Sequence, residues 1–177
     1  MFTDKAHLLT RLYEGTPLEK WHIARMLHQQ LGTAHPGLPV QVGRELDRLR
    51  EHCLSLSAHM RALAMHRLCA HCAARPGGGC CSALMADNSD VPQILINMLL
   101  NHPVAAPTEN GTECGFLGPE GCRFLVKPIF CLNYNCTHIV HATSPSALRE
   151  LEARAAAVLG SQTRIETALL EMLRAGL

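Results

Sequence analysis

Apolar residues recur every three or four positions over much of the chain, which is the spacing typical of amphipathic helices. A first short helix is predicted over residues 3–14. The residues that follow, Thr16, Pro17 and Glu19, have the pattern of a capped helix start. In this pattern a threonine oxygen and a glutamate three positions later satisfy early backbone N–H groups. We therefore predict a second helix that ends at about Leu31.

Two longer apolar stripes dominate the rest of the pattern. The first begins at about Val40 and predicts one continuous helix up to Cys69. The second begins at Ser144, continues across Gly160 and predicts one long helix to about Arg174. Stripes of this kind can pair as an antiparallel hairpin within one chain or across a homodimer, and the pattern does not choose between these arrangements.

The middle of the chain has shorter elements. Asp90 is the predicted N-cap of a short helix with Ile94 and Leu95 on its apolar face. The turn sequence of residues 118–121 predicts a small β-hairpin with one cysteine near the start of each arm. Residues 129–136 are predicted to be irregular or to form a single helical turn.

Cysteines are concentrated in this middle part. Eight of the nine cysteines lie between residues 69 and 136, and these are the candidate metal ligands: Cys69, Cys72, Cys80, Cys81, Cys114, Cys122, Cys131 and Cys136. The ninth, Cys53, falls among leucines on the apolar stripe of the long helix. Because a buried thiol behaves as a small hydrophobic group, we assign Cys53 to the core.

Composition narrows the class of protein. The chain has 177 residues, of which 47% are hydrophobic, and this suffices for a domain of ordinary size with its own core. The net charge of +1 gives no electrostatic reason to expect nucleic acid as a partner. The N-terminal segment lacks the apolar core of a signal peptide, and no apolar run is long enough to span a bilayer. We therefore expect a cytoplasmic protein without a membrane partner.

Clustered thiols in a cytoplasmic chain indicate metal binding, because reducing conditions disfavour structural disulfides. Thiolate is a soft ligand that suits iron–sulfur clusters and zinc. The spacing of Cys69 and Cys72 lets two sulfurs reach one metal from a single turn of backbone, and the glycines at 77–79 give the chain room to fold around it. Spacing alone does not distinguish a [4Fe–4S] cluster from Zn²⁺, or one site from two.

Histidine is a second candidate ligand, since it can replace a thiolate at zinc or iron. His71 lies inside the first cysteine pair, and His138 and His141 follow the last cysteine. Each is more simply explained as a polar surface or loop residue, and the His138–His141 pair is the one to test first. No histidine directly follows Cys72, which excludes the pattern of covalent haem attachment.

Taken together, these motifs resemble the YkgJ-like cysteine-cluster family, also described as the CxxCxxCC zinc- or iron-chelating domain. The matching parts lie within residues 69–140 and are Cys69-x-x-Cys72, Cys80-Cys81, Cys114-x-Phe116-Leu117, Gly121-Cys122, Lys127-Pro128-x-x-Cys131 and Cys136. The resemblance implies an eight-cysteine site for an iron–sulfur cluster or zinc. The chain departs from the family pattern in two places: seven residues separate Cys72 from Cys80, where the family name implies two, and Lys127 stands where arginine is commoner.

A related enzyme, flagellin lysine methylase, joins such a site to a methyltransferase activity. We do not extend that activity to this chain, because it is short and lacks the strand, glycine-rich loop and helix that would bind a methyl donor. No other catalytic motif is present, so we do not expect an enzyme on its own.

We therefore expect a mainly α protein, in which long helices surround a small cysteine-rich metal module with a short β-hairpin. Its parts are an N-terminal helical region (1–66), the metal module (67–142) and a C-terminal long helix (143–177), within one structural unit. The expected function is binding of a [4Fe–4S]-type cluster for electron transfer or redox sensing with an unidentified protein or redox partner. The alternatives are a structural zinc protein that acts as an interaction module, and a metallochaperone.

Overall fold

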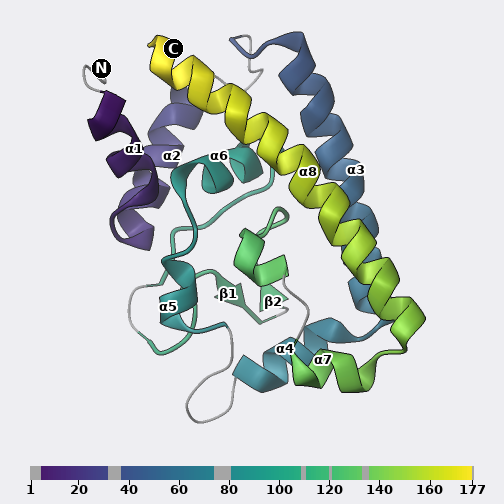
Figure 1. The fold of residues 1–177 in the computed structure, drawn as a ribbon. Coiled ribbons are helices and arrows are strands. Elements are labelled where there is room, and N and C mark those ends of the chain that lie inside the picture. Colours follow the sequence, from purple (N-terminus) through teal and green to yellow (C-terminus); the bar gives the residue numbers. More distant parts are fainter. Residues whose placement is uncertain are drawn as a thin grey trace.

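The computed structural model describes residues 5–31, 37–73, 81–108, 111–119, 121–132 and 136–176. It confirms the expected fold class, since about 70% of these residues are helical and they include a small two-stranded antiparallel hairpin. Figure 1 shows two long helices side by side along one flank of the molecule, with the shorter helices and the hairpin gathered beside them.

The N-terminal helices α1 (Lys5–Tyr13) and α2 (Pro17–Leu31) lie close to their predicted bounds. The predicted capping pattern is confirmed: the Glu19 N–H donates to Thr16 Oγ1 at 3.2 Å, and the Thr16 N–H donates to Glu19 Oε2 at 2.7 Å. These reciprocal hydrogen bonds satisfy N–H groups that the start of a helix leaves without a backbone partner.

Helices α3 (Val40–Ala62) and α8 (Pro145–Ala175) pack against each other, and α8 continues across Gly160 as predicted. Their polar contacts run in opposite sequence order, which establishes an antiparallel pair: His59 with Ala147, Ser55 with Arg154, His52 with Ser161, and Glu45 with Arg164. The apolar stripes of both helices are buried. The two stripes therefore pair within one chain, which decides between the arrangements that the sequence left open.

The prediction that one continuous helix reaches Cys69 is wrong. Helix α3 ends before a turn at Ala64, and a separate helix α4 (Met65–Ala73) follows. Ala64 has a φ of 52°, in the left-handed region that ends helices. The turn comes at the level where α8 begins, because His59 Nε2 lies 3.1 Å from the carbonyl oxygen of Ala147. The helix that buries the α3 stripe thus does not extend past the turn.

Helix α6 (Val91–Leu99) is surrounded by other elements. Its side chains from Val91 to Asn97 are all buried, and it contacts α1, α2 and α8. The predicted N-cap is confirmed, since Asp90 accepts a hydrogen bond from the Gln93 N–H at 2.7 Å. Because α6 comes from the middle of the chain, the three parts outlined from the sequence share one hydrophobic core.

The cysteine-rich part folds into short elements: α5 (Ala83–Ala86), β1 (Leu117–Gly118), β2 (Gly121–Cys122), the 3₁₀ helix η1 (Ile129–Leu132) and α7 (Thr137–Ala142). The predicted hairpin is confirmed, and so is a single helical turn at residues 129–132; residues 133–135 of that predicted segment lie outside the described residues. No sequence pattern predicts α5 or α7, because helices of four and six residues are too short to show a period. Within the described ranges, no helix combines the length and apolar character needed to cross a membrane.

The N-cap of α6 makes stability depend on pH. Burial raises the pKa of Asp90 to about 6, against the lowering effect of the Gln93 N–H, and Glu166 adds to the increase. At pH values between 3.8, the ordinary pKa of an aspartate, and about 6, the Asp90 carboxyl therefore holds its proton more often in the folded protein than in the unfolded chain. The free energy of unfolding should therefore fall as the pH rises from about 4 to about 6 and then level off.

We expect Asp90→Asn, which keeps the capping oxygen, to make this decrease in the free energy of unfolding smaller by about 1–3 kcal/mol. Urea unfolding of the wild type and the variant at about pH 4 and about pH 7 measures the difference, and comparison of the two proteins cancels the other titrating groups. Parallel pH profiles for the two proteins would contradict the assignment of this carboxyl.

Candidate metal centre

Backbone pairing brings together two distant segments of the cysteine-rich part, residues 69–81 and residues 114–136. The Cys114 N–H donates to the Cys81 carbonyl oxygen at 2.9 Å, beside an antiparallel bridge between Ser82 and Glu113. Cys81 is the last of the candidate ligands in residues 69–81, and Cys114 is the first of those in residues 114–136. Two segments far apart in the sequence therefore lie side by side at this point.

Helix α4 brings another pair of candidates to the same part of the fold. It carries Cys69 and Cys72 and lies against β2, whose last residue is Cys122. It also contacts α7, which begins directly after Cys136. Figure 1 shows α4, α7 and the hairpin near the end of the molecule opposite to both termini. The candidate ligands thus come from elements that meet at one end of the fold.

Cys131 lies in η1, where its N–H donates to the Pro128 carbonyl oxygen at 2.9 Å. Cys80 lies outside the described residues. The other seven candidate ligands are all half-buried. This intermediate position suits a metal ligand, because the thiol is shielded from bulk water and still accessible to an incoming ion.

Cys114 and Cys122 form the best-defined pair of thiols. Burial raises the pKa of both, and the neighbouring Cys122 adds to the increase at Cys114. The backbone N–H of Phe116 opposes the shift at Cys114, and the Lys127 ammonium and the N–H of Phe124 oppose it at Cys122. The backbone N–H groups of Phe116 and Phe124 thus favour the thiolate forms of the two cysteines, as backbone N–H groups do around metal centres.

Cys53 lies apart from this group, in the packing of α3. It is 1% exposed, and burial raises the pKa of its thiol to about 12. A thiol with so high a pKa is neither a ready nucleophile nor a ready ligand, because both roles require the thiolate. The sequence-based assignment of Cys53 to the core is confirmed.

The side chains do not form a compact ligand set within the part of the chain that the structure describes. No three His, Cys, Asp or Glu side chains there lie close enough together to hold one metal ion. The chain directly before Cys81 and the chain directly before Cys136 both lie outside the described residues. The structure thus brings the cysteine-bearing backbones together, and the donor set itself, made of thiols, fits a soft metal.

The three candidate histidines lie on the surface. His71 on α4 and both His138 and His141 on α7 are exposed. Because α4 and α7 are in contact, the three residues belong to the same end of the molecule as the cysteines. Their exposure agrees with the simpler explanation, that of polar surface residues.

Sequence patterns missed the polar residues that attach the cysteine-rich part to the helices. Gln93 and Asn97 are buried on α6, four positions apart. Asn97 accepts hydrogen bonds from the backbone of Leu125 and Val126, and Gln93 donates to the Val126 carbonyl oxygen. A polar pair at helical spacing within an otherwise apolar helix was the signal that could have revealed them.

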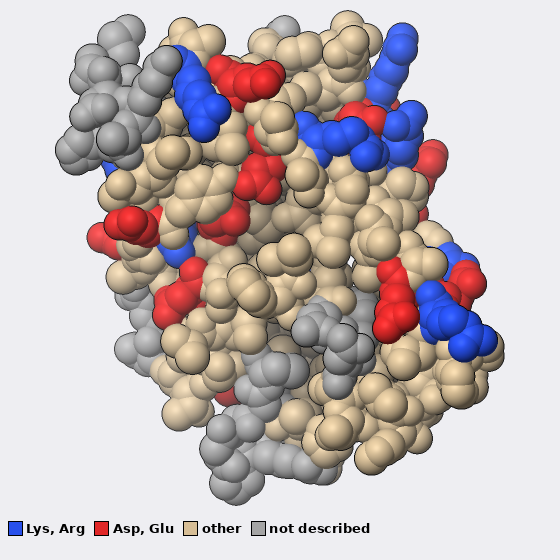
Figure 2. All heavy atoms as spheres, viewed as in Figure 1, with Lys and Arg blue, Asp and Glu red and all other residues tan. Residues whose placement is uncertain are grey.

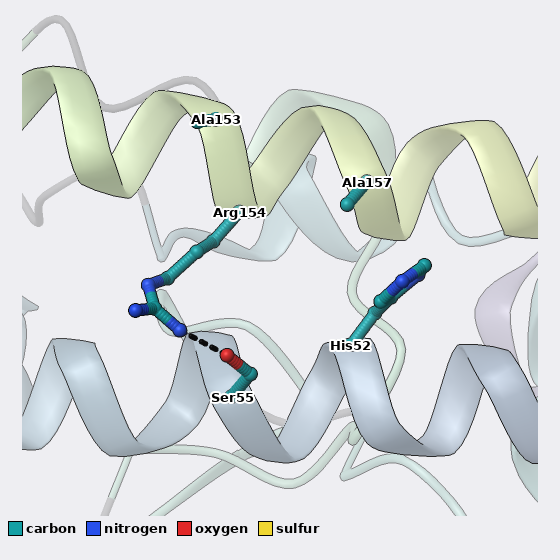
Figure 3. Close-up of a pocket in the computed structure, with 5 residues that line it drawn as sticks. All are labelled: His52, Ser55, Ala153, Arg154 and Ala157. Atoms are coloured by element: carbon teal, nitrogen blue, oxygen red, sulfur yellow. Dashed lines mark hydrogen bonds between the residues drawn. The ribbon is translucent and has the colours of Figure 1, made fainter.

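A separate hollow of about 200 Å³ lies between α3 and α8, and Figure 3 shows the residues that line it: His52, Ser55, Ala153, Arg154 and Ala157. Arg154 donates to Ser55 and to Glu150, and His52 contacts Ser161. The small alanine side chains leave the space open. Because no cysteine lines it, we attribute the hollow to helix packing and not to the candidate centre.

Charged side chains are unevenly distributed on the face that Figure 2 shows. Lys, Arg, Asp and Glu lie mainly over the α1–α2 and α3–α8 parts, whereas the lower part, over α4 and α7, is largely uncharged. The described residues on this face form no extended basic surface of the kind that binds nucleic acid.

The chain matches no family model, and no similar protein emerges among the characterised proteins or the solved structures compared with it. The similarity to the YkgJ-like family therefore stays a prediction that depends on the cysteine motifs.

Gly115 allows the segment beside Cys114 to pack closely. A Cβ at this position would lie 2.6 Å from the Thr108 carbonyl oxygen and 2.9 Å from Pro107 Cβ. We expect Gly115→Ala to lower the free energy of unfolding by about 1–3 kcal/mol, because the segment at 107–108 must move away. Urea unfolding followed by circular dichroism measures the change.

Gly43→Ala on α3 is the matched control. No atom lies within 4 Å of its added Cβ, so the variant should be neutral or more stable by up to about 1 kcal/mol, as alanine favours helix over glycine. Equal stability of Gly115→Ala and the wild type would show that this close approach is not a constraint.

Proposed function

We propose that the chain is a metal-binding cysteine-cluster protein, similar to the YkgJ-like family, that binds an iron–sulfur cluster of the [4Fe–4S] type. The observation that carries the proposal is the meeting of cysteine-bearing elements. The Cys81 and Cys114 backbones are hydrogen-bonded, and the α4 helix with Cys69 and Cys72 lies against the strand that ends at Cys122. Thiols gathered from distant segments suit a soft metal centre.

The proposed ligands are the eight clustered cysteines: Cys69, Cys72, Cys80, Cys81, Cys114, Cys122, Cys131 and Cys136. A bound cluster would supply one-electron chemistry, and electron transfer or redox sensing is the role that follows. The N–H groups beside Cys114 and Cys122 would stabilise the thiolate ligands, and such hydrogen bonds also tune the reduction potential of a cluster.

A structural zinc site is the second candidate, because the cysteine-rich part has little regular structure of its own. Each strand of its hairpin has two residues, and α5 has four. In small modules of this kind, the free energy of zinc binding becomes free energy of folding. The module would then bind a protein partner, or pass its metal on as a chaperone.

Anaerobic purification, followed by visible spectroscopy and elemental analysis, separates the two candidates. We expect a brown, air-sensitive protein that contains iron and acid-labile sulfide. A colourless protein with near-stoichiometric zinc and no iron would replace the first candidate with the second. A protein that holds neither metal, and whose thiols are found paired after purification with a thiol-blocking reagent, would overturn the metal proposal.

Substitution of single cysteines tests the ligand assignment. Cys69→Ser and Cys72→Ser should each weaken metal binding by at least about tenfold, since even the loss of an outer-shell partner costs that much. Cys53→Ala is the matched control: its thiol is buried in the α3 packing, so metal content should not change. Elemental analysis of the purified variants measures the effect, and equal metal content in all three would contradict the assignment.

A further inference from the structure

Asn97 is fully buried in α6, and its side chain uses all of its hydrogen-bonding groups. Its Oδ1 accepts from the N–H groups of Leu125 and Val126, both at 2.9 Å. Its Nδ2 donates to the carbonyl oxygens of Gln93 at 3.0 Å and Val126 at 2.8 Å. Two acceptor sites and two donors are the full capacity of a carboxamide, so this side chain is completely satisfied.

Two further side chains hold the same stretch of backbone. Gln93 Nε2 donates to the Val126 carbonyl oxygen at 2.6 Å, and His102 Nε2 lies 2.8 Å from the carbonyl oxygen of Arg123. Residues 123–126 belong to no helix or strand. Side chains from α6 and from the segment after it thus replace the pairing that a regular element would give this backbone.

The stretch that Asn97 holds connects two of the candidate ligands, because Cys122 directly precedes it and Cys131 follows shortly after. The helix that carries Asn97 is fixed independently, by its contacts with α1, α2 and α8. A buried carboxamide costs free energy unless its hydrogen bonds are made, and its loss would leave buried N–H groups without a partner. Asn97 makes three of the hydrogen bonds that hold Leu125 and Val126, more than any other described side chain, so the path of the chain from Cys122 toward Cys131 depends mainly on it.

We propose that Asn97 is a positioning residue for the candidate metal centre, acting by holding the backbone between Cys122 and Cys131 against α6. The inference rests on the proposed function, since it gives these cysteines the role of ligands. Asn97 acts through the backbone that it binds and not as a ligand. Asparagine is required because aspartate lacks the two donors and leucine lacks every polar group.

Alkylation of the reduced, metal-free protein tests the positioning role without any metal. We expect Asn97→Leu to speed the reaction of Cys122 with iodoacetamide about tenfold or more, because two N–H groups lose their acceptor and the segment opens more often. Cys53 should stay protected, since it is buried in the packing of α3. Mass spectrometry of the labelled peptides under native conditions measures both rates.

Zn²⁺ binding to the same reduced protein, measured by competition with a chromophoric chelator, tests the link to the metal. We expect Asn97→Leu to weaken Zn²⁺ binding by about 10- to 100-fold, the range seen when groups that orient ligands are removed. Gln162→Leu is the matched control, because it removes a buried amide from α8. This control should leave both the Zn²⁺ affinity and the alkylation of Cys122 unchanged.

The proposal is overturned if Asn97→Leu keeps Cys53 protected and leaves either the alkylation of Cys122 or the Zn²⁺ affinity as in the wild type. If the wild type binds neither zinc nor iron, the proposed function fails, while the alkylation rates still decide whether Asn97 holds Cys122. If Asn97→Leu unfolds, which rapid alkylation of Cys53 would reveal, Asn97→Asp replaces it. This variant keeps the acceptor oxygen and loses the two amide donors to Gln93 and Val126, and a wild-type rate at Cys122 would then overturn the proposal.

Discussion

The burial of α6 is the constraint on which the rest of the structure depends. This helix contacts α1, α2 and α8, and its side chains from Val91 to Asn97 have almost no exposed surface. Only 4% of the residues are aromatic, so the core consists mainly of aliphatic side chains, and a helix enclosed by others buries many of them at once. The same helix carries Gln93 and Asn97, which bind the backbone of the cysteine-rich part. One element therefore serves both as the centre of the core and as the support of the candidate site.

The lengths of α3 and α8 determine where the cysteines lie. These helices pack in antiparallel orientation until α8 begins, at the level of His59. There the chain turns through the left-handed Ala64, and α4 carries Cys69 and Cys72 against the hairpin and α7. Had α3 continued straight past the start of α8, its last turns would have lost the helix that covers their apolar stripe. The end of one helix pair thus becomes the meeting point of the candidate ligands.

This meeting point gathers cysteine-bearing segments in a partly buried setting. Its described thiols are half-buried, backbone N–H groups favour the thiolate forms of Cys114 and Cys122, and the part of the face in Figure 2 that lies over α4 and α7 carries few charges. Burial raises the pKa of these two thiols, so two adjacent thiolates are costly without a cation. In the proposed function, a bound metal supplies that positive charge and joins segments that are otherwise linked by a few backbone hydrogen bonds.

Features that depend on neighbouring residues could be predicted from the sequence alone. The caps at Thr16 and Asp90 are local hydrogen bonds, and the core position of Cys53 follows from the period of a helix. The mainly α class and the small hairpin depend on patterns of the same short range. The eight cysteines were also identified as candidates from their spacing, because a cluster of thiols stands out in any chain of this size.

Only the tertiary structure decided how these elements meet. The pairing of α3 with α8 inside one chain and the turn at Ala64 depend on where a partner helix begins, and no residue near the turn carries that information. The same holds for Asn97, whose role exists only because Leu125 and Val126 pack against α6. Sequence determined the helices, their caps and the thiols, because short-range hydrogen bonds and periodicity act within a few residues. The arrangement of the candidate site was decided by packing between segments that are distant along the chain.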